Sequence, residues 1–493
     1  MRDALLIFRK DVRRLWPLVA LNGFLFDSVA AGDVATIFNT KTAVPLLFMQ
    51  LPAILCPLFL IAALIQQEKL TGDRAYWFTR PFSWRNVLAA KLLFAVVLVS
   101  LPLLMAQVTA LLGTGLSPFA YAGMLLREQV RFFIVPVIEI FALAAVTRGM
   151  VEFIWVTLLC MVAQLIGLLI FLTVFNPAEA QDWPRFEWFR SAVLAAFALL
   201  FAAAILLLQY AGRRTTLARA TLAAAVIALA WARVLAPWHV GFDLARRWSG
   251  YAVDPVIGQV SYSPHPNLMH GGACWFERPG TFLFIPIDVK GIPENLAVFS
   301  ERTAARIETS DGRAWNSGWQ AVGQILPSSP GGSCLHKPLS NGPGWLNFNL
   351  PRRFRLQPTE RLHIRASVAF TLLGPVQTAT LPISTHMRWI SGVGFCAALV
   401  GEPPVVAECI APLEERAYTV LRTQPPVGPP CSEDLLSNSV MSSGIGIWRF
   451  SGGGGTCATQ GQIYLDSRQP IAYFERELDI SGIRLADLEY QRP

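Results

Sequence analysis

Long apolar segments fill the first 238 residues of the chain and constrain its fold more than any other feature. Each holds about 20 residues, the helix length that crosses the ~30 Å hydrocarbon core of a bilayer. The sequence therefore predicts an α-helical polytopic membrane domain of about seven spans. The predicted spans are residues 17–36, 44–66, 91–113, 131–148, 152–174, 191–211 and 218–238.

The composition changes after this apolar half. Residues 239–493 are rich in Pro, Gly, Ser and Thr, although the whole chain is 53% hydrophobic with a mean hydropathy of +0.44. Segments 282–290 and 362–372 show the β-branched and aromatic enrichment of strands, and Asp311-Gly312 is typical of a hairpin turn. We predict an all-β, sandwich-like soluble domain over residues 239–493.

Residues 1–16 are expected to form an amphipathic helix on the membrane surface, ahead of a transmembrane domain over residues 17–238. Apolar side chains recur on one helical face, whereas the basic residues lie largely elsewhere. The apolar positions are Leu5, Phe8, Val12 and Leu15.

Lysine and arginine in the connections between spans predict the orientation. With the N-terminus in the cytoplasm, one side carries fourteen and the other five, which follows the positive-inside rule. The fourteen are Arg2, Arg9, Lys10, Arg13, Arg14, Lys69, Arg74, Arg80, Arg85, Lys91, Arg148, Arg213, Arg214 and Arg219, and the five are Lys41, Arg127, Arg131, Arg185 and Arg190. Seven spans then place the β domain in the periplasm of a bacterial inner-membrane protein.

Six cysteines in residues 239–493 agree with an oxidising compartment. They are Cys274, Cys334, Cys396, Cys409, Cys431 and Cys457. Six cysteines allow fifteen pairings, so the connectivity stays open, with Cys396–Cys409 the favoured pair. The alternative is six reduced, buried thiols.

The connection between the second and third spans, residues 66–91, combines acidic, aromatic and basic side chains with a Gly and a Pro. The positions are Glu68, Gly72, Trp77, Arg80, Pro81 and Lys91, with Arg85 between the last two. This pattern, the preceding surface helix and the Ala144–Arg148 end of the fourth span resemble the ABC-2 type permease family of ABC transporters. The resemblance covers residues 1 to about 215.

The resemblance implies that this connection is a coupling helix docked on a separate cytoplasmic ATPase subunit, and that the permease dimerises with itself or a sister permease. Gly72 permits a turn, Trp77 suits a partner pocket, and Arg80 and Arg85 suit acidic partner residues. The alternative is an interfacial aromatic belt with positive-inside arginines.

Catalytic motifs are missing from the sequence. The dipeptide Gly-Lys never occurs, so the chain lacks a P-loop and any ATP must be bound by a separate subunit. Zinc-protease and serine-hydrolase signatures are also absent, so we expect a transporter subunit and not an enzyme. The net charge of +8 reflects membrane orientation and not nucleic-acid binding, and the scattered histidines do not predict a metal site.

Two acidic residues inside predicted spans are candidates for a translocation path. They are Glu139, beside Pro136, and Asp27, near the outer interface. The alternative is a carboxyl group that is hydrogen-bonded between helices. A rival function for the whole chain is a non-transporting, membrane-anchored protein whose β domain binds an envelope component.

Overall fold

The structure is a computed structural model that describes most of the chain. The described residues are 2–38, 43–67, 83–113, 117–119, 121–174, 187–235, 238–263, 281–326, 344–351, 354, 356–357, 359–381, 384–390, 394–399, 406–411, 418–424, 432–435, 437–440, 446–451, 462–485 and 488–491. They form two compact units: a helical unit of residues 1–174, 188–237 and 440–447, and a β-rich unit of residues 175–187, 238–439 and 448–493. The predicted helical first half and β-rich second half are confirmed.

The first helix, α1, runs without a break from Arg2 to Phe38. The predicted surface helix and the whole first predicted span, residues 17–36, therefore belong to one helix, with Pro17 inside it. Proline removes one backbone hydrogen bond from a helix. Leu15 and Val19, one turn apart on either side of it, are both buried in the same apolar cluster, and this packing keeps the helix continuous.

The other helices of the unit cover the remaining predicted apolar segments, and one further helix, over residues 122–132, lies almost wholly in a predicted connection between spans. They are α2 (Ala43–Gln66), α3 (Trp84–Ala95), the π-helix η3 (Val96–Ser100), α4 (Leu101–Gly113), α5 (Ala122–Phe132), the π-helix η4 (Phe133–Val137), α6 (Ile138–Val146), α7 (Met150–Val174), α9 (Glu187–Tyr210) and α10 (Thr215–Leu235). α3, η3 and α4 follow one another directly, as do α5, η4 and α6, so each trio forms one long helix with a wider turn inside it.

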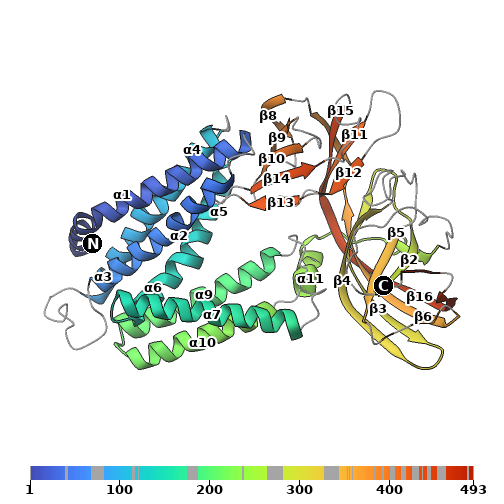
Figure 1. The fold of residues 1–493 in the computed structure, drawn as a ribbon, viewed down its shortest axis with the longest axis horizontal. Coiled ribbons are helices and arrows are strands. Elements are labelled where there is room, and N and C mark those ends of the chain that lie inside the picture. Colours follow the sequence, from blue (N-terminus) through green and yellow to red (C-terminus); the bar gives the residue numbers. More distant parts are fainter. Residues whose placement is uncertain are drawn as a thin grey trace. The chain divides into compact units, whose positions relative to one another are not determined.

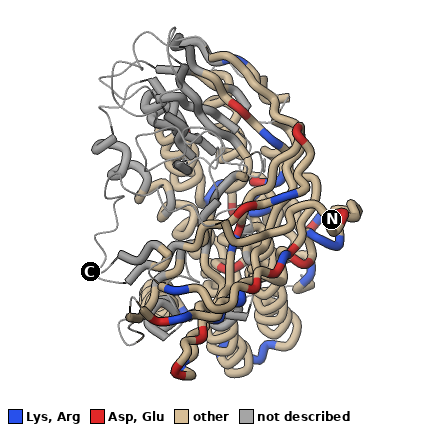
Figure 2. The backbone as a smooth tube through the Cα atoms, turned by 90° about the vertical axis from the view of Figure 1, so that its right-hand side faces the viewer, with Lys and Arg blue, Asp and Glu red and all other residues tan. Residues whose placement is uncertain are grey.

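Within the described residues, four helical segments are long and apolar enough to cross a membrane: Trp84–Gly113, Ala122–Val146, Met150–Gly167 and Ser191–Tyr210. The apolar stretches Leu51–Gln66 and Thr215–Leu229 are shorter. In Figure 2 much of the helical backbone is tan, because few of its residues carry a charge. A membrane-embedded helical unit is supported, and the count of seven spans stays a prediction.

Apolar side chains from α1, α2, α3 and α6 form the core of the helical unit, in which α1 packs along α2 and α4 (Figure 1). Ile61, Phe94 and Phe141 are completely buried there. By contrast, Trp155 and Leu159 of α7 are 68% and 67% exposed. An apolar helix face turned away from the protein is suited to contact with lipid chains.

The first element that lies wholly in the β-rich unit is helix α11 (Trp238–Trp248). Its strands are β1 (Gln259–Tyr262), β2 (Thr281–Lys290), β3 (Ala297–Thr309), β4 (Ala314–Leu326), β5 (Gly344–Leu350), β6 (Arg361–Leu373), β7 (Gln377–Leu381), β8 (Ser384–Ile390), β9 (Gly394–Leu399), β10 (Val406–Ala411), β11 (Tyr418–Gln424), β12 (Ser432–Leu435), β13 (Ser437–Val440), β14 (Gly446–Ser451), β15 (Gln462–Arg468), β16 (Pro470–Arg484) and β17 (Glu489–Gln491). The predicted strands at 282–290 and 362–372 are confirmed as β2 and β6.

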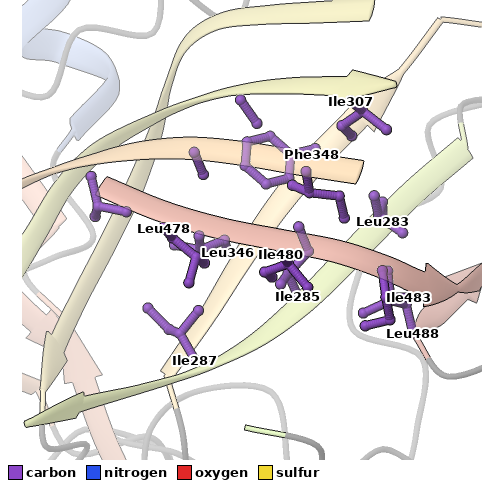
Figure 3. Packing of buried hydrophobic residues seen from close by; sticks show 14 of the residues in the cluster. Leu283, Ile285, Ile287, Ile307, Leu346, Phe348, Leu478, Ile480, Ile483 and Leu488 are labelled. Carbon is purple, nitrogen blue, oxygen red and sulfur yellow. The ribbon is translucent and has the colours of Figure 1, made fainter. Parts of the chain in front are cut away.

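Two sheets enclose the main core of this unit. The long sheet has the order β16-β6-β3-β4, and the short sheet joins β1, β5 and β17 to β2. Alternate residues of each strand point between the sheets, as Leu283, Ile285 and Ile287 of β2 do (Figure 3). These three side chains are fully buried, and each burial contributes about 1.5–3 kcal/mol to folding. The arrangement is a β-sandwich.

A second β region is continuous with two strands of the long sheet. β6 leads into β7 and β15 leads into β16, and the pairing of β6 with β16 continues as pairing of β7 with β15. The strands β8 to β14 follow β7 and precede β15, and they complete the sheets β12-β11-β15-β7 and β13-β14-β10-β9-β8. Residues 382–461 are therefore inserted between two strands that pair with each other.

The Asp311-Gly312 hairpin is confirmed between β3 and β4. Gly312 has φ +85°, a conformation that glycine adopts without a steric penalty. The Thr309 hydroxyl and the Arg313 guanidinium donate hydrogen bonds to the Asp311 carboxylate, and they lower its pKa to about 2. The turn is thus held by side chains as well as by backbone geometry.

Candidate functional site

The predicted coupling residues fall into two groups. Glu68, Gly72, Trp77, Arg80 and Pro81 lie outside the described residues, whereas Arg85 and Lys91 lie in α3. The helix ends on either side of the 68–82 connection are described, and they define the candidate site.

Helix α3 begins directly after the connection. The Ser83 hydroxyl accepts a hydrogen bond from the Asn86 backbone N–H, which caps the helix. The Asn86 side chain in turn donates to the Asp3 carboxylate of α1 at 3.3 Å. Arg85 is exposed, with its guanidinium 5.5 Å from the centre of the Trp84 ring. The α3 start is thus attached to α1 and leaves the Arg85 charge free to face solvent or a partner.

Lys91 does not face solvent. Its ammonium donates to the Asp11 carboxylate of α1 at 2.8 Å, and the two side chains are 1% and 0% exposed. Phe8 and Phe94 pack edge to face beside this pair, with ring centres 6.3 Å apart. A buried charge is costly without a partner of opposite sign. Separating α3 from α1 would break this buried ion pair, so the pair holds the two helices together.

The other side of the connection is also held. Gln66, at the end of α2, donates to the Thr147 hydroxyl, which follows α6, at 3.1 Å. Arg219 of α10 forms an ion pair with Glu152 of α7 at 2.6 Å, and Glu152 also accepts from the Arg148 backbone N–H. Three connections that the charge pattern assigns to one membrane side therefore meet at one end of the helical unit.

Asp11 is the residue of this site that sequence reasoning missed. It lies among the basic residues of the segment that is predicted to be a surface helix. The available signal was its position, because Ile7, Asp11, Leu15 and Val19 recur at every fourth residue and all four are buried. An acidic residue on an apolar helix stripe predicts a buried partner, although not which one.

The candidate translocation residues, Glu139 and Asp27, lie in α6 and α1. Glu139 is half-buried in the first turn of α6, directly after η4, and it has no hydrogen bond or ion pair with the described part of the chain. Asp27 is exposed on α1. The buried Gln107 side chain of α4 accepts a hydrogen bond from Gln129 of α5 at 3.0 Å, and this bond joins the two helices.

Two charged residues of the long sheet are buried. The register of β3 shifts at Glu301 against both neighbouring strands, which marks a β-bulge. Glu301 accepts hydrogen bonds from the hydroxyls of Thr371 and of Tyr418 in β11, at 2.5 and 2.7 Å. These three residues, the Glu301 cluster, attach the inserted β region to the long sheet. The next residue, Arg302, stacks on Trp238 of α11 at 4.9 Å.

Four of the six predicted disulfide cysteines lie outside the described residues: Cys274, Cys334, Cys431 and Cys457. Cys396 is buried in β9, and its direct cross-strand partner is Cys409 in β10. The free thiols in the described residues are Cys56 and Cys160, and Cys396 is not one of them.

The described residues contain no group of three His, Cys, Asp or Glu side chains suited to a metal ion. Comparisons of this chain with protein-family models and with curated proteins found no match. The class of protein is therefore defined by the fold: a helical unit with membrane-like helices, followed by a large β-rich unit.

Proposed function

We propose that the chain is the membrane subunit of an ATP-driven transporter of the ABC-2 type, working with a separate cytoplasmic ATPase. The proposal includes seven spans, a cytoplasmic N-terminus and a β-rich unit outside the cytoplasm of a bacterial inner membrane. It also includes a dimer with itself or a sister permease. The resemblance of residues 66–91 to the coupling connection of that family motivates it.

The observation that carries the proposal is the buried pair of Asp11 and Lys91. A connection that docks on an ATPase transmits force to the spans only when its flanking helix ends are fixed. Lys91 and Asn86 fix the beginning of α3 to α1, and Gln66 fixes the end of α2 to the segment after α6. Movement of the 68–82 connection would therefore reach several helices together.

Charge supports the proposed orientation. The helix ends at Gln66, Thr147 and Arg219 come together, and the connections at these ends carry most of the basic residues. The positive-inside rule places such an end in the cytoplasm.

Within this proposal Glu139 lies on the translocation path. A carboxyl group without a described partner is costly inside a membrane unless it meets water or cargo. The neighbouring π-helix η4 supports this role, because π-helical turns are frequent at functional sites. We expect Glu139→Gln to reduce transport without preventing assembly.

The proposal also includes a disulfide between Cys396 and Cys409. Directly opposite residues of an antiparallel ladder have Cα atoms about 4.5–5.5 Å apart, within the range that disulfides span. A membrane-impermeant maleimide added to intact spheroplasts should label these thiols after reduction and not before. Labelling without reduction would contradict the disulfide, and labelling only after permeabilisation would contradict the orientation.

The function is tested by purifying the tagged chain from its native membrane in a mild detergent. We expect one P-loop ATPase to copurify, and the double variant Trp77→Ala with Arg80→Ala to lose it. Arg131→Ala is the matched control, because this arginine is exposed and is assigned to the opposite membrane side. If no ATPase copurifies, or if the double variant retains it fully, the chain is better explained as a membrane anchor for an envelope-binding β-rich unit.

A further inference from the structure

The first half of α1 has two faces that differ in burial. The inner face packs against α2 and α3, and it buries Ile7 and Leu15 in the apolar core of the helical unit (Figure 1). Phe8 and Val12 pack against the same core, whereas Leu5 is 50% exposed. Most of the apolar face predicted for residues 1–16 therefore contacts protein, and a different face is left for other partners.

Five residues of the exposed face follow one line along the helix, which we call the outer stripe of α1. They are Arg9, Arg13, Trp16, Ala20 and Phe24. The spacing i, i+4, i+7, i+11 and i+15 places them on one side of an α-helix. All five are exposed, Trp16 by 62% and Phe24 by 66%. From its N-terminal end, the outer stripe is first basic, then aromatic and then apolar.

The two arginines of the outer stripe have no acidic partner in the part of the chain that the structure describes. Their neighbour Asp11 is buried on the inner face, where it pairs with Lys91. Residues four apart lie side by side on a helix surface, and like charges at this spacing destabilise the helix. An anion bound by both Arg9 and Arg13 would remove this repulsion.

The Asp11–Lys91 pair places the arginines relative to a bilayer. Lys91 directly precedes residues 92–113, the uncharged part of a candidate membrane span, which covers about 33 Å and so matches the ~30 Å hydrocarbon core. Lys91 therefore lies at the edge of the hydrocarbon when this segment crosses. Asp11 lies beside it, and Arg9 and Arg13 are within about 3 Å of Asp11 along the helix axis. Both arginines are therefore at the level where acyl chains meet phosphates.

The rest of the outer stripe follows the order of a bilayer. α1 and α3 run in the same direction, because their contacts with one another advance together along both helices. Trp16 lies about one turn deeper than Arg13, and tryptophan is enriched at the membrane interface. Ala20 and Phe24 lie deeper still, at the level of the acyl chains.

We propose that the outer stripe of α1 binds an anionic phospholipid, with its phosphate between Arg9 and Arg13 and its acyl chains along Trp16 and Phe24. The planar guanidinium group suits this ligand, because it donates two parallel hydrogen bonds to a phosphate. A headgroup without a cation of its own leaves the negative charge available to both arginines. The site requires the helical unit to lie in a membrane and requires no ATPase, so it succeeds or fails separately from the transporter proposal.

The test uses the full-length chain in phosphatidylcholine nanodiscs that contain a small fraction of a photoactivatable lipid with a diazirine in its acyl chain. The probe is phosphatidylglycerol, and phosphatidylcholine with the same diazirine is the lipid control. Mass spectrometry of peptides after illumination measures the adducts on residues 16–24. We expect the ratio of phosphatidylglycerol adducts to phosphatidylcholine adducts to be several-fold above one.

Charge variants then locate the phosphate. Arg9→Gln and Arg13→Gln should each lower this ratio about fivefold, and the double variant should bring it close to one. Arg9→Lys with Arg13→Lys keeps both charges and should keep most of the ratio. Arg14→Gln is the matched control, because Arg14 is exposed on the same helix but lies about 100° around it from Arg13, and it should leave the ratio unchanged.

Two results with this probe would overturn the proposal: a ratio near one for the unmodified chain, or an unchanged ratio for the double variant. Elution of each variant with the unmodified chain shows that it is folded, and the unmodified chain tests the proposal without any substitution. A protein is the rival occupant of the outer stripe. p-Benzoylphenylalanine at position 16, illuminated in native membranes, should give lipid adducts, and a crosslink to a protein instead would also overturn the proposal.

Discussion

Replacing either member of the buried Asp11–Lys91 pair should destabilise the helical unit strongly. Asp11→Asn leaves the Lys91 ammonium without its carboxylate, and Lys91→Met leaves the Asp11 carboxylate with only the Lys10 ammonium, which is 3.6 Å away on a side chain that is 42% exposed. Both side chains are at most 1% exposed, so water cannot replace the lost partner. Removing one partner of a buried pair costs about 3–5 kcal/mol, or roughly two to four powers of ten in the folding equilibrium.

The double variant Asp11→Leu with Lys91→Met should be much less destabilised than either single variant. It removes both charges and both desolvation penalties, and apolar replacement of a buried ion pair is often neutral or stabilising. The apolar neighbours Phe8 and Phe94 suit such a replacement. The double-mutant cycle should therefore give a large coupling energy.

The free energy of unfolding would be measured by far-UV circular dichroism in mixed dodecyl maltoside and SDS micelles. Arg131→Gln is the control, because the Arg131–Glu128 pair is 3.8 Å long with the arginine side chain 56% exposed, and such surface pairs contribute about 0–1 kcal/mol. The reasoning is refuted if the single variants lose less than about 1 kcal/mol, or if the double variant loses the sum of the two.

Three further predictions concern the β-rich unit. Gly291→Ala should cost more than about 2 kcal/mol in thermal unfolding, because φ is +75° and the new Cβ would lie 2.1 Å from the Val256 carbonyl oxygen. Tyr418→Phe removes a donor from the buried Glu301 carboxylate and should cost about 1.5–3 kcal/mol by the same assay. Asp311 should titrate by NMR near pH 2; because its pKa is lowered from 3.8 on folding, its stabilising contribution is complete above pH 3.8 and is lost as the pH falls toward 2.

Each of these predictions has a control within the chain. Gly312→Ala has a positive φ and open space around the new Cβ, so it should cost less than the substitution at Gly291. Tyr251→Phe, at a tyrosine that is 46% exposed, should leave the stability unchanged. Arg313→Ala should move the Asp311 midpoint toward 3.8, and an unchanged midpoint would contradict the assigned cause of the shift.

The sequence by itself determined the features that depend on local interactions. Apolar segment length and composition identified the helices from α2 to α10 except α5, because a helix satisfies its backbone hydrogen bonds within one segment. Enrichment in β-branched residues located β2 and β6, and Asp311-Gly312 located a hairpin, because turn type depends on the conformational freedom of neighbouring residues.

The tertiary structure alone decided which distant residues meet. Asp11 looked like one charge among several at the N-terminus, and its partner lies 80 residues further along the chain. Glu301 became a buried acceptor because a bulge in β3 and the distant Tyr418 bring two hydroxyls to it. The insertion of residues 382–461 between the paired β7 and β15 is a matter of long-range strand register. Local sequence patterns indicate which buried polar groups need a partner. Which residue becomes that partner depends on the packing of the whole chain.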